Sequence, residues 1–422
     1  MNAEILSIGD ELLIGQVTNT NASYLGEQLS LLGITVRRVT TVGDRIEEIL
    51  DAFNRAWQEQ DVIITTGGLG PTHDDVTRNA VCRFFDTVLV ENADVLSDVE
   101  RFLAERKKPI SPTNRDQAMV PGGASIIRNQ NGTAPGYHFH RENKHFFVTP
   151  GVPYEMHGMT EQYILPELRK IATNNRASLT ILTTSMPEST LADLLLGIES
   201  QREGCSIAYL PSPLGVRVRI TAVAEDQGTA AQQVEELRKA IADRAGEYIF
   251  GSGKDSLEQV LGAMLTERGQ TLAVAESCTG GLITDRITNV PGSSDWFEHG
   301  VVCYSNRSKT KLLSVNPAVI DRHGAVSKQT AEAMAAGIRR TADTDFGLAT
   351  TGIAGPDGGT PNKPVGLVWI ALSSAEGSFA FEYYFGNDRV LTKQRAAQAA
   401  LDMLRRALLR LPLQPRTARP IL

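Results

Sequence analysis

Ser277 and Lys309 are the residues whose types and surroundings point most directly to chemistry. Residues 275–281 read Ala-Glu-Ser-Cys-Thr-Gly-Gly, between an apolar run at residues 271–275 and an amphipathic stretch at residues 282–288. This pattern predicts a strand that leads into a helix, with the serine at the junction. Unpaired backbone N–H groups and the positive end of the helix dipole would lie there and could stabilise an oxyanion. The segment is therefore a candidate nucleophile turn of a Ser/Lys amidohydrolase.

Lys309 is the candidate base for that serine. A serine hydroxyl needs a base, and lysine can serve only when burial or nearby positive charge lowers its pKa below the usual value of about 10.4. Lys309 lies near the start of a predicted helix, where the dipole disfavours its charge, and Arg307 and Lys311 would add to the effect. Tyr304 could relay a proton or orient the lysine. The alternative is that Lys309 is a solvated surface charge and Ser277 a helix cap, and spacing alone favours neither reading.

Cys278 is a second candidate nucleophile beside the serine. A thiol at a helix N-terminus is reactive, but no histidine stands next to it in the sequence. Free cysteines are commonly small buried residues. We therefore expect Cys278 to be structural and Ser277 to be the nucleophile.

A glycine-rich segment, residues 352–360, follows a predicted strand at residues 348–351. Its backbone N–H groups could approach an anion closely. It matches neither the P-loop nor the dinucleotide pattern, and a long turn before the strand at residues 365–372 is the alternative that spacing favours slightly. Arg389 begins the last helix and could pair with a phosphate, although such an arginine is more often solvated.

A second candidate site lies near the N-terminus. Residues 65–75 follow a strand and read Thr-Thr-Gly-Gly-Leu-Gly-Pro-Thr-His-Asp-Asp, a pattern typical of an anion-binding loop at the carboxyl end of a strand. The predicted nucleotide-binding residues are Gly67, Gly68, Gly70 and Thr72. The predicted ligands of a divalent cation such as Mg²⁺ or Mn²⁺ are Asp44, Asp74 and Asp75. Alternatively, one of the last two caps the helix that begins near Val76. His73, His138 and His140 could also bind metal, but hydrogen-bonded or surface roles are favoured.

The elements around these residues indicate an α/β protein of three parts. In the first part, strands at residues 5–8, 35–39 and 62–65 alternate with helices at 21–32 and 46–57, which predicts parallel β/α winding. It continues through a strand at residues 146–149 to a helix near residues 153–170.

The middle part is expected to be a small α+β module. It has strands at residues 179–184 and 216–224, helices at 191–199 and 229–242, and a linker at 251–254. The last part returns to α/β order and ends in a helix at residues 390–411. The predicted domains are residues 1–172, 173–252 and 253–415.

Length and composition limit the class of protein. The chain has 422 residues, 41% of them hydrophobic and 22% charged, which is typical of a multidomain globular protein. Its net charge of -7 argues against broad nucleic-acid binding. No apolar run reaches the roughly 18–20 residues of a membrane span, no leader is evident, and four scattered cysteines fit neither disulfides nor zinc. We expect a cytoplasmic protein without membrane contact.

Four motifs in the last part resemble the nicotinamide mononucleotide deamidase domain of the CinA (competence/damage-inducible protein) family. They are Ala-Glu-Ser-Cys-Thr-Gly-Gly, Pro-Gly-Ser-Ser at residues 291–294, Tyr-Ser-Asn-x-x-Lys at 304–309, and Thr-Gly-Ile-Ala-Gly-Pro-x-Gly-Gly-Thr at 351–360. The resemblance implies hydrolysis of the substrate carboxamide to nicotinate mononucleotide and ammonia, with no cofactor. It implies that Ser277 is the nucleophile, Lys309 the general base and Tyr304 its helper. The predicted substrate-binding residues are Thr279, Gly280, Gly281, Ser294, Thr351, Gly352, Gly355, Gly358 and Arg389.

The first part also resembles this family, through its domain with the fold of molybdopterin-binding proteins. The matching segments are Gly-Asp-Glu-Leu-Leu at residues 9–13, Val-Gly-Asp at 42–44, the glycine-rich loop, Asn-Gly-Thr-Ala-Pro-Gly at 131–136 and Pro-Gly-Val-Pro-Tyr-Glu-Met at 150–156. This resemblance implies hydrolysis of ADP-ribose with a divalent metal. The middle part is similar to the family's KH-type domain, but it has no Gly-x-x-Gly loop, so we do not expect it to bind nucleic acid.

These inferences predict a bifunctional hydrolase of pyridine-nucleotide salvage that acts on nicotinamide mononucleotide and ADP-ribose. Two alternatives stay open: a molybdopterin- or nucleotide-binding protein without pyrophosphatase activity, and a competence accessory that acts by protein contact. We expect a homodimer, because homo-oligomers are common among such enzymes.

Overall fold

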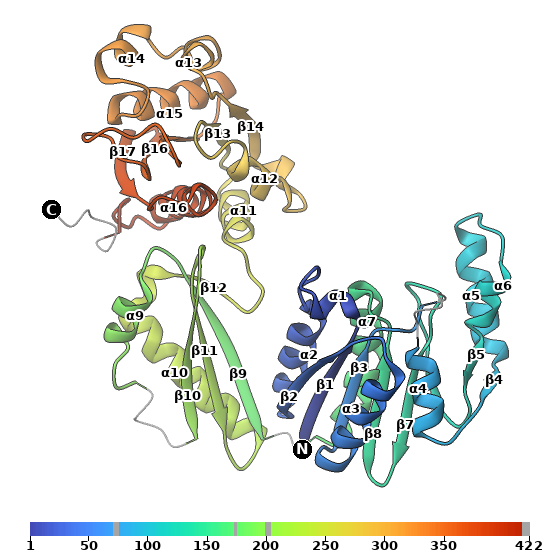
Figure 1. The fold of residues 1–422 in the computed structure, drawn as a ribbon. Helices are drawn as coiled ribbons and strands as arrows, with labels where there is room; N and C mark the ends of the chain where they lie inside the picture. Colours follow the sequence, from blue (N-terminus) through green and yellow to red (C-terminus); the bar gives the residue numbers. More distant parts are fainter. Residues whose placement is uncertain (71–75, 173–174, 199–203, 416–422) are drawn as a thin grey trace. The chain divides into compact units, whose positions relative to one another are not determined.

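The computed structural model describes residues 1–70, 76–172, 175–198 and 204–415 (Figure 1). The chain separates into two compact units, Met1–Ala177 with Val223–Ala230, and Ser178–Ala222 with Ala231–Leu422. Both units combine helices with central sheets, so the predicted α/β class is confirmed. None of the helices in the described part of the chain is long and apolar enough to cross a membrane.

The first unit is built on a mixed six-stranded sheet in the order β2-β1-β3-β8-β7-β6. Strands β2, β1, β3 and β8 are parallel, as predicted, but β7 and β6 run antiparallel. The sequence analysis assigned neither of these two strands. Strand β7 is antiparallel to β8 because a tight turn at Glu142 and Asn143, both with positive φ, joins them, and such a turn permits only an antiparallel hairpin. The strands are β1 (Asn2–Ile8), β2 (Thr35–Val42), β3 (Val62–Thr66), β6 (Ser125–Ile127), β7 (Gly136–Arg141) and β8 (Lys144–Thr149).

Helices cover both faces of this sheet. One apolar layer joins the sheet to α2 (Thr20–Leu31), α7 (Pro153–Met159) and α8 (Leu165–Arg169), with a π-helical turn at Thr160–Ile164 between the last two. The other layer joins it to α3 (Ile46–Glu59) and α4 (Thr77–Phe84). The smaller elements are α1 (Asp10–Leu13), α5 (Ala93–Glu105), α6 (Pro112–Asp116), β4 (Leu89–Glu91) and β5 (Met119–Pro121).

A small module, most of which belongs to the second unit, has a sheet with the order β10-β11-β9-β12. Its elements are β9 (Arg176–Thr183), α9 (Glu188–Leu194), β10 (Cys205–Ser212), β11 (Gly215–Val223), α10 (Gln227–Ala245), a 3-10 turn at Gly246–Tyr248 and β12 (Ile249–Ser252).

Three sequence expectations for this module are wrong. Strand β10 was not predicted; it forms by pairing along its whole length with β11. The helix expected to reach residue 199 ends at Leu194, ahead of Gly197 with φ 81°. The expected linker begins too early, because Gly251 and Ser252 pair with β9 as part of β12.

The rest of the second unit is a three-layer α/β/α domain with the strand order β14-β13-β15-β16-β17. Strands β14, β13 and β15 are parallel, and β16 and β17 continue the sheet antiparallel. Helix α15 packs on one face, and α11, α12 and α16 pack on the other. The elements are α11 (Leu257–Arg268), β13 (Leu272–Glu276), α12 (Leu282–Thr288), a 3-10 turn at Ser293–Asp295, β14 (Phe297–Val302), α13 (Asn306–Leu313), α14 (Pro317–His323), α15 (Lys328–Ala342), β15 (Phe346–Gly352), β16 (Leu367–Ser374), β17 (Gly377–Tyr384) and α16 (Arg389–Leu408).

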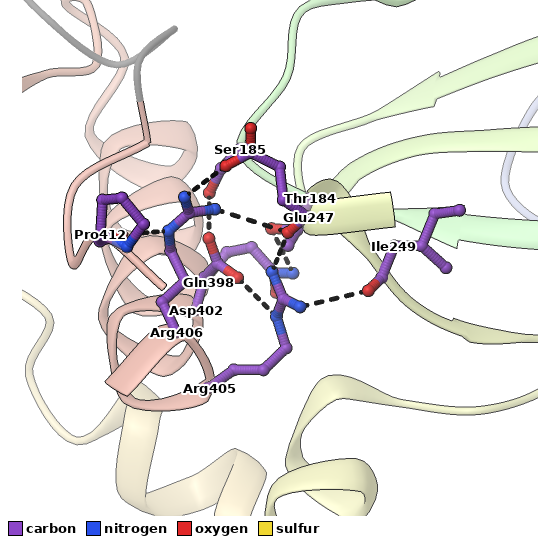
Figure 2. A network of polar contacts seen from close by, with 9 residues as sticks. All are labelled: Thr184, Ser185, Glu247, Ile249, Gln398, Asp402, Arg405, Arg406 and Pro412. Carbon is purple, nitrogen blue, oxygen red and sulfur yellow. Dashed lines mark hydrogen bonds and ion pairs between the residues drawn. The ribbon is translucent and has the colours of Figure 1, made fainter. Parts of the chain in front are cut away.

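The carboxyl half of α16 carries a polar network that ties the two parts of this unit together (Figure 2). The Arg405 guanidinium donates to the carbonyl oxygens of Glu247 and Ile249, at 2.7 and 3.1 Å, and Arg406 forms an ion pair with the Glu247 carboxylate at 2.7 Å. Asp402 accepts hydrogen bonds from Arg405 and from the Ser185 hydroxyl. Because Arg405 and Arg406 are buried, these bonds satisfy charges that would otherwise be costly to bury.

Candidate functional site

Ser277 and Lys309 lie together at the carboxyl end of β13. Ser277 is the first residue after that strand, and its N–H donates to the Thr350 carbonyl oxygen of the neighbouring strand β15 at 3.0 Å. Lys309 reaches it from the first turns of α13, with Nζ 3.0 Å from the Ser277 hydroxyl oxygen. The two side chains that the sequence singled out are therefore in direct hydrogen-bond contact.

The surroundings of Lys309 favour a neutral amine. Its Nζ also donates to the carbonyl oxygens of Cys303 and Tyr304, at 2.9 and 3.3 Å. These two acceptors occupy two N–H groups, so in the neutral form the lone pair is left to face the Ser277 hydroxyl. The side chain is 1% exposed, and no carboxylate among the described residues forms an ion pair with it. A solvated surface lysine, the alternative weighed from the sequence, is excluded.

Burial lowers the pKa of Lys309 from its ordinary value. The direction agrees with the sequence expectation, and of the causes named there, burial rather than nearby positive charge is the main one. Desolvation of the ammonium group is the largest effect, and the neighbouring cysteines oppose it. The sequence could not show this, because burial depends on how α13 packs beneath the nucleophile turn.

Glu276 is a functional side chain that the sequence reasoning missed. It is the last residue of β13, is completely buried, and accepts hydrogen bonds from the N–H groups of Gly281, Ile283 and Thr284 and from the Thr284 hydroxyl, at 2.8–3.2 Å. The carboxylate thus fills the positive end of α12, which we had expected to serve an oxyanion. The signal for this cap was present in the sequence as an acidic residue shortly before the helix.

This cap narrows the choice of oxyanion donors. The N–H of Gly281 is used by Glu276, so its predicted role as a backbone donor to substrate is corrected. Within the described chain, the N–H of Gly280 donates to no other residue, whereas the N–H of Thr279 interacts with the Cys278 sulfur. The Thr279 side chain is buried, with its hydroxyl 2.8 Å from that of Thr350. Of the three predicted backbone donors, Gly280 therefore keeps the N–H that an oxyanion would need.

Cys278 has the properties expected of a structural residue. Its side chain is buried in the apolar layer between the sheet and α12. Burial raises the pKa of the thiol to about 12. Since the thiolate is the reactive form, the structure favours Ser277 as the nucleophile.

Tyr304 and Arg389 form a second contact at the site. The Arg389 guanidinium donates to the Gly355 carbonyl oxygen at 2.7 Å and to the Tyr304 hydroxyl at 3.2 Å. It thereby links the glycine-rich loop, the start of α16 and the segment before α13. Tyr304 touches Lys309 through its backbone carbonyl, while its ring is exposed and its hydroxyl faces Arg389. The backbone of Tyr304 thus orients the lysine, and the structure shows no hydroxyl contact to Lys309.

The remaining predicted substrate residues make no common cluster. Ser294 is exposed in the 3-10 turn before β14. Since β14 starts opposite Leu272, the first residue of the parallel strand β13, Ser294 lies at the other end of the sheet from Ser277, and the structure does not bring the two together. Thr351 is buried, and its hydroxyl donates to the Ala325 carbonyl oxygen at 2.8 Å. Gly355 and Gly358 have positive φ, and a side chain at Gly352 would meet the Leu367 carbonyl oxygen at 2.6 Å. Their roles in substrate binding stay predictions.

In the first unit, Asp44 is paired with Asp10, a residue absent from the predicted ligand set. The Asp10 N–H donates to the Asp44 carboxylate at 3.0 Å, and the Asp44 N–H donates to the Asp10 carboxylate at 3.3 Å. This exchange brings two carboxylates together at the carboxyl ends of β1 and β2. Oxygen donors of this kind suit a hard divalent cation.

The glycine-rich loop of this unit is shaped by close packing. A side chain at Gly67 would lie 2.0 Å from the Ile8 carbonyl oxygen, and one at Gly68 would lie 2.1 Å from the Thr77 hydroxyl. Gly70 is the last residue of this loop that the structure describes before residue 76. Buried oxygens of Asn21, Thr65 and Thr77 have no hydrogen-bond partner among the described residues. Such polar atoms are unusual in a folded protein and fit a crevice that takes a polar ligand.

Thr72, His73, Asp74 and Asp75 lie outside the described residues, so the full predicted metal set is not tested. Within the described ranges, no three His, Cys, Asp or Glu side chains form a cluster that could hold a metal. His138 is hydrogen-bonded to His145 and Tyr163, and burial lowers its pKa to about 4. That environment agrees with the hydrogen-bonded role favoured for it.

Three protein-family models match the chain in order. They are "Probable molybdopterin binding domain" over residues 4–170, "Damage-inducible protein CinA KH domain" over 178–251 and "CinA C-terminal domain" over 254–408. The class is therefore a mixed α/β protein with a molybdopterin-binding-like domain, a small KH-type module and a CinA C-terminal domain.

Similar proteins cover the whole length of the chain. A CinA-like protein of Salinibacter ruber is 42% identical over 411 residues, spanning 97% of this chain and 100% of the relative. A CinA-like protein of Kosmotoga olearia is 41% identical over 409 residues, spanning 97% and 99%. Among solved structures, the competence/damage inducible protein CihA of Agrobacterium tumefaciens is 37% identical over 37% of this chain and 97% of its own, with a TM-score of 0.35. The chain belongs to the CinA family, and the resemblance drawn from its motifs is confirmed.

Proposed function

We propose that the C-terminal part of the chain is a Ser/Lys amidohydrolase that deamidates nicotinamide mononucleotide to nicotinate mononucleotide and ammonia. The observation that carries the proposal is the Lys309 amine, buried and oriented by two carbonyl oxygens, 3.0 Å from the Ser277 hydroxyl. A hydroxyl beside a desolvated amine is the pairing that activates a serine nucleophile.

In the first half of the proposed reaction, the Ser277 oxygen attacks the carboxamide carbon while its proton passes to Lys309. The negative charge on the carbonyl oxygen is held by the N–H of Gly280, which donates to no other described residue, with the N–H of Thr279 beside it. Lys309, now an ammonium, returns the proton to the departing nitrogen, so that ammonia leaves and an acyl-serine remains.

In the second half, water attacks the acyl-serine. Lys309 takes a proton from the water and gives it to the Ser277 oxygen as the ester bond breaks, which restores the starting state. Each half uses the amine once as base and once as acid. This alternation requires a lysine whose pKa is lowered from its ordinary value, and burial shifts the pKa of Lys309 in that direction.

The choice of substrate rests on the family resemblance and on Arg389. Its guanidinium has no ion pair with any described carboxylate and is oriented by Gly355 and Tyr304. An arginine in this state is suited to the phosphate of a nucleotide.

Ammonia release from nicotinamide mononucleotide tests this proposal. We expect Ser277→Ala and Lys309→Ala each to lower kcat by at least about 100-fold, the typical contribution of a general base. Lys328→Ala, which removes an exposed lysine at the start of α15, should keep the parent rate. Undiminished turnover in Lys309→Ala would remove the proposed base, and no turnover by the parent would favour a binding role.

For the first unit we propose hydrolysis of ADP-ribose, with Asp10 and Asp44 holding a divalent metal such as Mg²⁺ or Mn²⁺. Their mutual hydrogen bonds bring two carboxylates together at one edge of the sheet, which supports a polar ligand site. A bound cation would offset the negative charge of the pyrophosphate. Asp74 and Asp75 would complete the set that the sequence predicted.

Metal removal tests the second activity. We expect hydrolysis of ADP-ribose to stop in chelator and to return with added metal, and Asp44→Asn to raise the metal concentration needed. Asp51→Asn, at an exposed position on α3, is the matched control. Activity that persists in chelator would refute the metal, and binding of ADP-ribose without hydrolysis would favour the alternative of a nucleotide-binding domain. The homodimer and the cytoplasmic location stay predictions, as does a competence role through protein contact.

A further inference from the structure

Lys393 is a cation at the candidate active site that neither the sequence reasoning nor the proposed mechanism uses. It lies on α16, four residues after Arg389. Residues at this spacing are neighbours on one face of a helix. Its side chain is half-buried, so the ammonium group is partly withdrawn from solvent.

The lysine extends over the nucleophile turn. A Cβ built on Gly280 would lie 3.4 Å from Lys393 Nζ. Gly280 itself has φ 65°, a conformation that favours glycine, and the missing side chain leaves room for the ammonium. The positive charge therefore lies beside a backbone N–H that is also free.

Lys393 differs from the other basic residues of its helix, because it has no hydrogen-bond or ion-pair partner among the described residues. Arg395 donates to the Phe385 carbonyl oxygen, Arg405 pairs with Asp402, and Arg406 pairs with Glu247. Lys393 makes no ion pair or hydrogen bond with any part of the chain that the structure describes. Together with Arg389, it gives this face two cations without a carboxylate.

We propose that Lys393 is a specificity-determining residue that binds, with Arg389, the phosphate of a mononucleotide substrate. This rests on the proposed deamidation, since it assigns the group that separates a nucleotide from its nucleoside. Arg389 supplies a planar donor fixed by Gly355 and Tyr304, and Lys393 supplies a point charge from the adjacent turn. A phosphate carries close to two negative charges at neutral pH, which two unpaired cations would balance.

Comparing two substrates with and without the phosphate tests the inference. Lys393→Gln is expected to lower kcat/KM for nicotinamide mononucleotide by roughly 10- to 100-fold, the range of one charge-assisted contact, and to leave kcat/KM for nicotinamide riboside nearly unchanged. Lys393→Arg should keep most of the preference for the phosphorylated substrate. The matched control is Arg395→Gln, which removes one positive charge from the same helix. Inorganic phosphate should inhibit the parent competitively and Lys393→Gln more weakly.

The outcomes separate this inference from the proposed function. Deamidation with an unchanged substrate preference in Lys393→Gln would overturn the role of Lys393 and leave the reaction standing. An equal loss on both substrates would show a structural role and would also overturn it. If the parent hydrolyses neither substrate, the proposed function fails, and binding of inorganic phosphate by calorimetry decides the subsite. Phosphate binding that is lost in Lys393→Gln and kept in Arg395→Gln would support it, and no binding by the parent would overturn it.

Discussion

At the scale of single residues, the candidate site contains two ionisable side chains that are buried away from water. Lys309 is a buried amine, and Glu276 is a completely buried carboxylate. Each is satisfied by neighbouring groups: two carbonyl oxygens for the lysine, and three N–H groups and a hydroxyl for the glutamate. The proposed chemistry therefore depends on Lys309, whereas the stability of the turn depends on Glu276.

The lowered pKa of Lys309 predicts a pH dependence of stability. The native state loses this proton at lower pH than the unfolded chain does, so between the two pKa values the unfolded state binds more protons. The free energy of unfolding contributed by Lys309 should then rise with pH, from its native pKa up to the ordinary lysine value. We expect the stability of the parent relative to Lys309→Met to increase over that range in denaturant titrations. A constant difference would contradict the lowered pKa. Activity of the parent should rise with pH as native Lys309 loses its proton and should level off above that pKa.

Substitution of Glu276 should loosen the nucleophile turn. In Glu276→Gln, the amide nitrogen of the new side chain would face backbone N–H groups and leave at least one of them without an acceptor. We expect a loss of about 1–3 kcal/mol of stability, measured by urea unfolding. The control Glu298→Gln, on the exposed strand β14, should change it by less than about 0.5 kcal/mol. Equal effects of the two changes would show that the cap contributes little.

At the scale of elements, both candidate sites lie where parallel strands end and the chain turns back. Ser277 follows β13, and the Gly67 loop follows β3. Parallel strands that share an edge bring their carboxyl ends together, so residues far apart in sequence meet there. The close approach of neighbouring segments at these ends explains several of the glycines.

Gly67→Ala should destabilise the first unit. The added methyl group would lie 2.0 Å from the Ile8 carbonyl oxygen, at φ 114°, so the strand ends would have to separate. We expect a loss of at least about 1–3 kcal/mol. Gly26→Ala is the contrast, since Gly26 lies inside α2 with nothing within 4 Å of the new methyl. It should stabilise the same unit by about 0.4–1 kcal/mol. The shift in the unfolding midpoint of each variant measures the effect, and similar shifts for both would refute the packing argument.

At the scale of the whole molecule, buried charged side chains join the KH-type module to the C-terminal α/β/α domain within the second unit. Helix α16 brings Arg389 to the candidate site with its first turn. Its last turns bring Arg405 to the KH-type module (Figure 2). One helix thus belongs to both the site and the junction. The buried charges specify how these two parts fit together within the unit.

Removing one partner of this junction should cost far more than removing a surface pair. Arg405→Met leaves the buried Asp402 carboxylate with less compensation, and we expect a loss of about 3–5 kcal/mol in the second unit. Adding Asp402→Leu should recover part of it, because the unpaired charge is then gone. The control Arg238→Met, which breaks an exposed pair with Glu235, should change stability by less than about 1 kcal/mol. A small effect of Arg405→Met would show that solvent or rearrangement relieves the charge.

Local sequence patterns predicted much of the fold. Apolar runs and helical periodicity placed β13, α12 and α3 within a residue or two, because those signals lie within each segment. They missed β10, which forms by pairing with β11, and β7, which pairs with β8 across a two-residue turn. In the site, residue types pointed to Ser277 and Lys309, while Glu276, Asp10 and Lys393 were missed because their roles come from contacts.

The sequence by itself determined the family, the α/β class and the identity of the candidate nucleophile and base, because these follow from residue types at short spacing. Only the tertiary structure decided that Lys309 is buried against the Ser277 hydroxyl, that Glu276 rather than a substrate occupies the start of α12, and that Lys393 reaches Gly280. Burial and charge pairing arise where strands β13 and β15 and helices α12, α13 and α16 meet. No segment of the chain carries that information alone.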